Sequence, residues 1–239
     1  YGVRGKLSPE LEQAVARDGW TLPSLQQAVD QFVIHYDVCG TSQQCFKILH
    51  DVRGLSVQFM LDIDGTLYQT LDLKERAWHA GTANDRSIGV EIAHIGAYPD
   101  MRTLNEWYSL DAFAWPRITL PAWMGDGGLR TPGFVGRPAR PEVVRGRING
   151  HDLVQYDFTP EQYTAMIRLC AALTRVLPKM KLDVPRDTDG RVRADVMTGE
   201  ELNAWSGPVI IVGAQERYQS RCRACFILDN KYWTEIKRL

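Results

Sequence analysis

The sequence has no excess of either charge and no long apolar run. Its 239 residues include 28 basic and 29 acidic side chains, so the formal net charge is −1. Phosphate binding by a whole chain needs a clear basic excess, which argues against a nucleic-acid-binding protein. No run of about 18 apolar residues is present, so we expect no membrane-spanning helix. These absences leave an ordinary globular protein.

Cysteine is also scarce, and the 5 cysteines are too few for a disulfide scaffold. Their odd number leaves at least one free thiol. They form two close pairs and one isolated residue: Cys39 with Cys45, Cys222 with Cys225, and Cys170. A C-x-x-C pair can hold zinc, form a disulfide or carry two ordinary thiols, and the sequence leaves these alternatives open.

Apolar periodicity and turn signals predict strands that alternate with helices. Asp64-Gly65 is a strong hairpin signal between two strand-like segments. Thr159-Pro160-Glu161-Gln162 is a capping box at the start of an amphipathic segment. The alternation favours a single α/β domain over residues 1–239. The predicted strands are 31–36, 57–63, 66–71, 87–93 and 208–212, and the predicted helices are 9–18, 41–52 and 159–177.

Two insertions interrupt this alternation, at about 97–154 and 182–203. The first holds six of the 12 prolines, and it also carries Trp107, Trp115, Trp123 and an arginine-rich end. We expect it to be irregular, and long irregular insertions are usually functional loops or disordered segments. Interleaved tryptophan and arginine favour packing or ligand contact over disorder.

Several short motifs follow one another in a distinctive order. Residues 32–36 read FVIHY, 77–81 read AWHAG and 84–92 read NDRSIGVEI, with LSVQFMLDIDGTLYQTL at 55–71 between the first two. A histidine near the end of a strand suits a metal ligand or an acid–base group, or simply a half-buried side chain bonded to a neighbour. The order and spacing resemble the type-2 N-acetylmuramoyl-L-alanine amidases, which include the peptidoglycan recognition proteins. The resemblance is strong over residues 30–96 and weaker at the later helix and at PVIIVG.

The resemblance implies a mixed central β-sheet flanked by helices, with a zinc ion in a groove. It implies hydrolysis of the amide bond between N-acetylmuramic acid and L-alanine by a zinc-activated water. His35 would be the first zinc ligand and Glu91 the general base. Trp78, His79 and Asn84 would line the substrate groove. The plainer alternatives are an exposed acid on an edge strand for Glu91 and a packing motif for the Trp-His pair.

The rest of the implied ligand set is incomplete. Relatives carry Gly-His after the late apolar strand, and here Ala214 stands at the histidine position. Cys222, eight residues further on, is the candidate for another ligand. The chain could therefore be a binding-only pseudo-amidase, or it could hold zinc in a rebuilt site. The rebuilt site would use His35 and Cys222, with one residue from a set of three: Cys225, His151 and Asp229. A third alternative is a terminal region that differs from the natural enzyme for reasons outside the sequence.

The same resemblance guides the remaining expectations. The six-residue spacing of Cys39 and Cys45 is similar to a pair that is bridged in many peptidoglycan recognition proteins. We expect the partners to be peptidoglycan or muropeptide fragments, the location to be the cell envelope, periplasmic or secreted, and the protein to be a monomer. A different metal hydrolase on the same sheet is a more distant alternative, because a fold does not fix a function.

Overall fold

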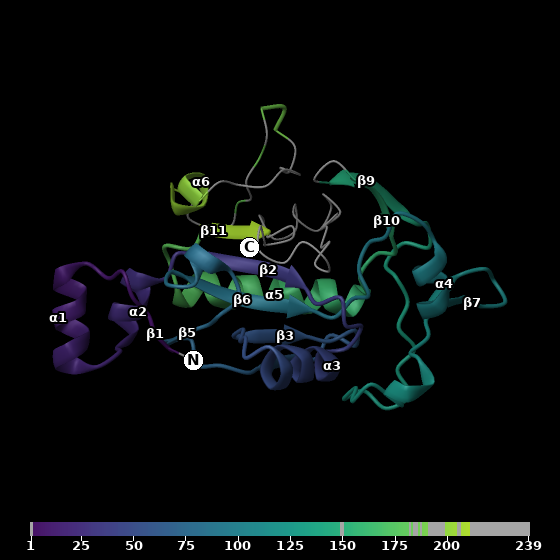
Figure 1. Cartoon of the computed structure of the whole chain (residues 1–239), viewed down its shortest axis with the longest axis horizontal. Coiled ribbons are helices and arrows are strands. Elements are labelled where there is room, and N and C mark those ends of the chain that lie inside the picture. The colour runs from purple at the N-terminus through teal and green to yellow at the C-terminus, as the bar shows by residue number, and fades with distance from the viewer. Residues whose placement is uncertain are drawn as a thin grey trace.

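The computed structural model describes residues 2–148, 151–181, 183, 186, 188–190, 199–204 and 207–210. Within these residues the central sheet has five strands in the order β11-β2-β6-β3-β4 (Figure 1). Neighbouring strands are parallel except for the antiparallel β3–β4 hairpin, so the sheet is mixed, as predicted. The strand bounds are β2 Gln31–Tyr36, β3 Phe59–Leu61, β4 Leu67–Gln69, β6 Ser87–Ile92 and β11 Gly207–Ile210.

The strand register aligns four side chains across the sheet. His35 on β2 pairs with Glu91 on β6, Glu91 pairs with Met60 on β3, and Met60 pairs with Tyr68 on β4. Paired residues in neighbouring strands point to the same face, because side chains alternate along each strand. The four residues therefore form one row on one face, and the residues between them on each strand belong to the other face.

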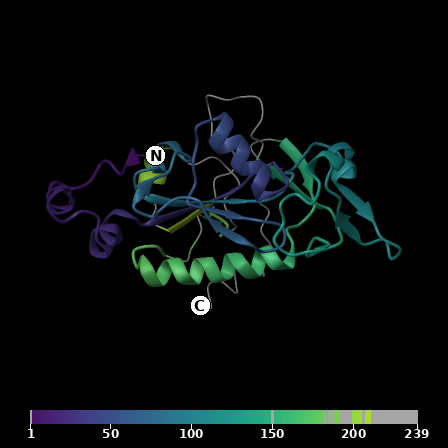
Figure 2. The ribbon, with the colours of Figure 1, turned by 90° about the horizontal axis from the view of Figure 1, so that it is seen from below.

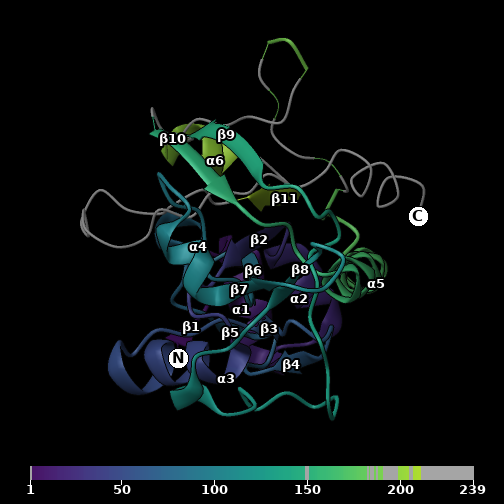
Figure 3. The same cartoon turned by 90° about the vertical axis from the view of Figure 1, so that its right-hand side faces the viewer.

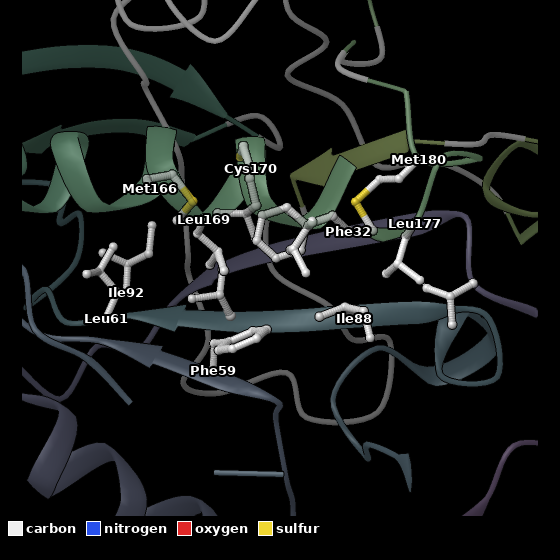
Figure 4. Packing of buried hydrophobic residues seen from close by; sticks show 14 of the residues in the cluster. Phe32, Phe59, Leu61, Ile88, Ile92, Met166, Leu169, Cys170, Leu177 and Met180 are labelled. Atoms are coloured by element: carbon white, nitrogen blue, oxygen red, sulfur yellow. The ribbon is translucent and has the colours of Figure 1, made fainter. Parts of the chain in front are cut away.

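That other face is covered by α5, Pro160–Val176 (Figure 2). Its start is fixed as predicted: the Thr159 hydroxyl accepts from the Gln162 backbone N–H, and the Gln162 side chain accepts from the Thr159 backbone N–H. Apolar side chains from the helix then meet those of three strands (Figure 4). The cluster includes Phe32, Ile34, Phe59, Leu61, Ile88, Val90, Ile92, Met166, Leu169, Cys170 and Leu173.

The face that carries His35 is covered in part by α3, Ser42–Phe46, and the π-helical turn Lys47–Val52 that continues it. Helices thus lie on both faces (Figure 2), as expected. The predicted helix over 41–52 thus divides into two parts. Cys45 is buried, but Phe46 is 38% exposed and Val52 is 78% exposed. The π-helical turn after Phe46 changes the number of residues per turn, so Val52 does not lie on the same face as Cys45.

The N-terminal segment lies at one end of the sheet. It consists of β1 Gly2–Val3, α1 Pro9–Asp18 and α2 Leu22–Ala28, and β1 pairs with β5, Glu75–Arg76. Arg4 fastens this segment to the fold. Its fully buried guanidinium donates to four backbone oxygens: those of Leu73, Asn84, Asp85 and Ser87.

The first insertion lies at the opposite end, beyond the carboxyl ends of β2 and β6. Figure 3 shows α4, β7 and β8 in front of the sheet strands at this end. The expectation of an irregular segment holds only in part, because short elements with a small core of their own interrupt it. Its strands are only three to five residues long, so their alternation is too short to stand out in the sequence. The elements are α4 Arg102–Trp107, β7 Tyr108–Leu110, β8 Pro116–Ile118, a 3-10 turn Ala122–Met124, β9 Val144–Ile148 and β10 His151–Gln155.

The second insertion is described only in part, and α6, Gly199–Ala204, lies at its end. Among the described residues, no helix combines the length and the apolar character needed to cross a membrane.

Candidate active site

Two histidines from distant segments meet on the face of the sheet that carries His35 and Glu91, which we call the polar face. His35 is the second-last residue of β2, and His79 lies in the AWHAG turn after β5. The Nε2 atom of His35 is 3.1 Å from the Nδ1 atom of His79. The rings are nearly perpendicular, at 81°, with centroids 5.3 Å apart. The structure thus brings together two residues that the sequence assigned to the metal and to the substrate groove.

The position of His79 depends on three neighbouring residues. The Asn84 side-chain oxygen accepts from the backbone N–H groups of His79 and Ala80, at 3.2 and 2.6 Å. The Ser87 hydroxyl lies 3.2 Å from Nε2 of His79. Gly89 provides the space, because a Cβ atom there would lie 2.6 Å from two atoms of the His79 ring. Within S-I-G-V-E, serine binds the imidazole, glycine makes room for it, and the glutamate follows on the same face.

Glu91 is half-buried beside His35 in the strand register. Burial raises the pKa of Glu91 well above its usual range, and the nearby Asp37 carboxyl raises it further. Burial also lowers the pKa of His35 to about 4. The pKa of His79 is lowered mainly by burial, with the charge of a protonated His35 as a smaller cause. Both imidazoles are therefore neutral at pH 7, which is the form that binds metals.

The loop after β2 and the helix α3 that follows it hold three further potential metal ligands. Ligand atoms of Asp37, Cys39 and Cys45 all lie within 4.8 Å of one another. One Asp37 oxygen accepts from the backbone N–H groups of Cys39, Gly40 and His94 at 2.9, 3.3 and 3.0 Å. The other oxygen is buried without a hydrogen-bond partner among the described residues. Burial raises the pKa of Asp37 to about 7. Both cysteines are free thiols here, so the bridge suggested by the resemblance is not formed in this structure.

Sequence reasoning missed Asp37. The available signal was its position two residues after His35, which by strand alternation places it at the same end of the sheet and on the same side.

The insertion contacts the loop that follows β2. A Cβ atom on Gly40 would lie 2.4 Å from the Trp107 ring, so the insertion packs closely against the segment that follows the candidate metal ligand.

Trp78 and Asn84 differ in exposure. Trp78 is 47% exposed, and the Arg76 guanidinium carbon lies 4.3 Å from the centroid of its ring. Asn84 is 3% exposed, and its oxygen already accepts the two backbone N–H groups of the AWHAG turn. An exposed indole is free to meet a ligand, whereas the Asn84 oxygen orders the turn that carries His79.

Of the remaining predicted residues, the structure describes only His151. Ala214, Cys222, Cys225 and Asp229 lie outside the described residues. His151, one of the residues considered for a rebuilt site, is an exposed residue at the start of β10. The described part of the predicted site therefore consists of His35, Glu91 and the AWHAG turn.

The fold is that of an α/β protein, with a mixed sheet covered by helices on both faces. Neutral imidazoles and a carboxyl lie near the carboxyl ends of β2 and β6, and they form a candidate metal-hydrolase centre. Residues 25–192 match the family model of the N-acetylmuramoyl-L-alanine amidases. The match spans well over half of the chain, and the chain belongs to this family.

One similar solved structure is the N-acetylmuramyl-L-alanine amidase AmiD from E. coli, in complex with the substrate anhydro-N-acetylmuramic acid-L-Ala-D-γ-Glu-L-Lys. The sequence identity is 17%, the TM-score is 0.37, and the match covers 63% of this chain and 44% of that chain. The chain thus spans less than half the length of that protein. No curated protein matches this chain.

Proposed function

We propose that the chain is a peptidoglycan amidase that hydrolyses the amide bond between N-acetylmuramic acid and the L-alanine of the stem peptide. Family membership supports the reaction class. The observation that carries the proposal is the register pair of His35 and Glu91, which sets a neutral imidazole beside a carboxyl on the polar face of the sheet. A metal ligand and a general base need this proximity, because both act on one water molecule.

Among the described residues, His35 is a donor of the kind that zinc binds. His35 offers an unprotonated ring nitrogen, and zinc prefers imidazole, thiolate and carboxylate ligands. His35 and, by the sequence, Cys222 would hold the ion. When bound, zinc supplies a Lewis acid for the amide carbonyl and lowers the pKa of a water molecule.

Glu91 then acts as the general base. Its carboxylate takes a proton from the attacking water while the water oxygen bonds to the lactyl carbonyl carbon. Cleavage of the C–N bond releases the amine of L-alanine, which receives the proton that Glu91 held. The products are a free muramic acid carboxylate and a stem peptide with a free N-terminus. The raised pKa of Glu91 makes it a stronger base than an exposed glutamate.

The substrate contacts would come from the AWHAG turn and the insertion. Trp78 and the insertion's Trp115 and Trp123 expose 47%, 39% and 68% of their surface, and aromatic rings suit the faces of sugars. Arginine side chains suit the carboxylates of the stem peptide. Peptidoglycan and muropeptides are thus the proposed partners, and a cell-envelope location, periplasmic or secreted, follows from that substrate.

Product analysis tests the proposal. Purified protein with zinc is incubated with a muropeptide, and the products are identified by mass spectrometry. We expect a stem peptide with free N-terminal L-alanine and an N-acetylmuramic acid fragment, and we expect neither from His35→Ala. Cleavage of another bond, or equal cleavage by His35→Ala, would contradict the proposal.

A binding-only pseudo-amidase is the second candidate, and the observation in its favour is Ala214 at the expected histidine position. Calorimetry separates the two functions. The pseudo-amidase would bind muropeptide with measurable heat and leave it intact even when the protein is saturated with zinc.

A further inference from the structure

We propose that His79 is a zinc ligand that shares the ion with His35. The inference rests on the proposed function, because it assumes that zinc binds beside His35. It assigns the AWHAG histidine to the metal rather than to the substrate.

The spacing of the two imidazoles fits one shared ion. Zinc binds each histidine nitrogen at about 2.0–2.1 Å in tetrahedral geometry, which separates two ligand nitrogens by about 3.3 Å. His35 Nε2 and His79 Nδ1 are 3.1 Å apart. In the structure this contact is a hydrogen bond between the two rings, so an ion would replace the proton that they share, and the two nitrogens would move apart only slightly.

The second ring nitrogen of His79 has a neighbouring polar group, as is usual for histidines that bind a metal. Histidine ligands usually have their second ring nitrogen bonded to a neighbouring group, which fixes the tautomer and orients the ring. The Ser87 hydroxyl lies 3.2 Å from Nε2 of His79. With the proton on Nε2 and shared with this hydroxyl, the lone pair lies on Nδ1, which is the nitrogen that faces His35.

The backbone and the sheet hold the same ring in place. The Asn84 oxygen binds the backbone N–H of His79, and Gly89 lies directly under the ring, where a side chain would collide with it. A side chain held from three directions loses little additional freedom on binding an ion.

Two imidazoles change the count of ligands. Catalytic zinc sites usually have three protein ligands and one open position. Among the described residues, His35 and His79 provide two of them. Glu91, paired with His35 in the register, then stays free to act as the base.

Metal affinity tests the inference without any measurement of activity. Zinc affinity is measured by competition with a chromophoric chelator for the wild type, His35→Ala, His79→Ala and His50→Ala. His50 is the matched control, because it is an exposed histidine beside Asp51 on the π-helical turn. We expect at least about a 100-fold loss of affinity for His35→Ala and His79→Ala, since even the outer partners of ligands contribute up to this much, and no change for His50→Ala.

A measurement on the wild type covers the case in which His79→Ala does not fold. In cadmium-loaded protein with nitrogen-labelled histidine, we expect nitrogen–cadmium coupling at Nε2 of His35 and at Nδ1 of His79. Coupling at His35 without coupling at His79, or wild-type affinity in folded His79→Ala, would overturn the inference and leave the proposed function standing. If the wild type binds no zinc, or if His35→Ala binds it fully, the zinc mechanism fails as well.

Discussion

The two faces of the central sheet are built from the same strands, but one face stabilises the fold and the other carries ionisable side chains. On the α5 face, Phe32, Ile34 and Val90 are fully buried among apolar side chains. Each such burial contributes roughly 1.5–3 kcal/mol to stability. One residue along, the other face carries His35 and Glu91, whose charged forms are disfavoured by burial. The alternation of the strand lets one face stabilise the fold while the other holds reactive groups.

The polar face also keeps groups that an optimised core would not tolerate. Asp37 has a buried oxygen without a hydrogen-bond partner among the described residues, which costs about 1–3 kcal/mol in a protein interior. Gly89 gives up a side chain in the middle of a buried strand so that His79 fits. Sites that break the rules of stable packing in this way are typically functional.

The largest effect we expect is on activity, from Glu91→Gln on the polar face. Loss of a general base lowers kcat by about 10²–10⁴-fold. Stability should not fall, because burial raises the pKa of Glu91 and so makes its charged form costly in the folded state. A neutral amide removes that cost above the unfolded pKa. Muropeptide turnover and urea unfolding at neutral pH measure the two effects, and a large loss of stability with unchanged turnover would reverse the comparison.

Phe32→Ala on the α5 face should have the complementary effect. The side chain is fully buried under α5, and truncation of such a phenylalanine costs about 3–5 kcal/mol. The free energy of unfolding should fall by this amount, while kcat of the protein that remains folded should stay near the wild-type value. Denaturant unfolding and active-site-normalised kinetics check this. A loss of kcat as large as that of Glu91→Gln would show that the two faces are not separable.

His94 tests whether a histidine outside the site affects stability alone. Its Nε2 donates to the Tyr156 carbonyl oxygen, its Nδ1 accepts from Gly96 N–H, and its ring contacts Phe158. Burial lowers the pKa of His94 from 6.5 to about 4. Protonation therefore favours the unfolded chain. The stability that neutral His94 provides is complete above about pH 6.5 and is lost as the pH falls toward 4.

The loss from His94 should amount to about 3 kcal/mol over this range, because one pKa unit corresponds to 1.36 kcal/mol. His94→Asn cannot titrate and should be less stable at neutral pH, with the difference from the wild type shrinking as the pH falls. Urea unfolding across the range measures it. A difference that stays constant with pH would mean that His94 is not held neutral.

Gly89→Ala should cost less stability than Phe32→Ala and should have a specific effect on the site. The new Cβ would lie 2.6 Å from the His79 ring, and overpacking of this kind costs about 1–3 kcal/mol. We expect His79 to move away from His35, with lower zinc affinity at a modest cost in stability. Ala83→Gly, a change at a buried residue of the neighbouring turn, is the control that creates no collision. Wild-type zinc affinity in Gly89→Ala would show that His79 does not need this position.

Most of the fold could be predicted, because local signals agreed with the final packing. The β2 and β6 strands, the Asp64-Gly65 hairpin and the Thr159 capping box appear at or near the predicted bounds. The elements of the insertion could not be predicted, since its strands are only three to five residues long and pack on a small local core. Likewise, no periodic signal marks the π-helical turn at 47–52.

The site could be predicted only in part. The motifs identified His35, Glu91 and His79, but no pattern indicates that two imidazole nitrogens face each other. That contact arises from the pairing of β2 with β6 and from the space above Gly89. The buried position of Asn84 is also a tertiary feature, since it depends on how the AWHAG turn folds back over the sheet.

Reversible removal of the metal tests most directly the claim that the polar face is a zinc-dependent amidase site. The same sample of protein is assayed on a muropeptide as purified, after treatment with a chelator, and after zinc is restored. We predict that release of peptides with N-terminal L-alanine stops with the chelator and returns with zinc, while the fold measured by circular dichroism stays unchanged. Cleavage that continues without metal, or no cleavage by protein shown to hold zinc, would contradict the account.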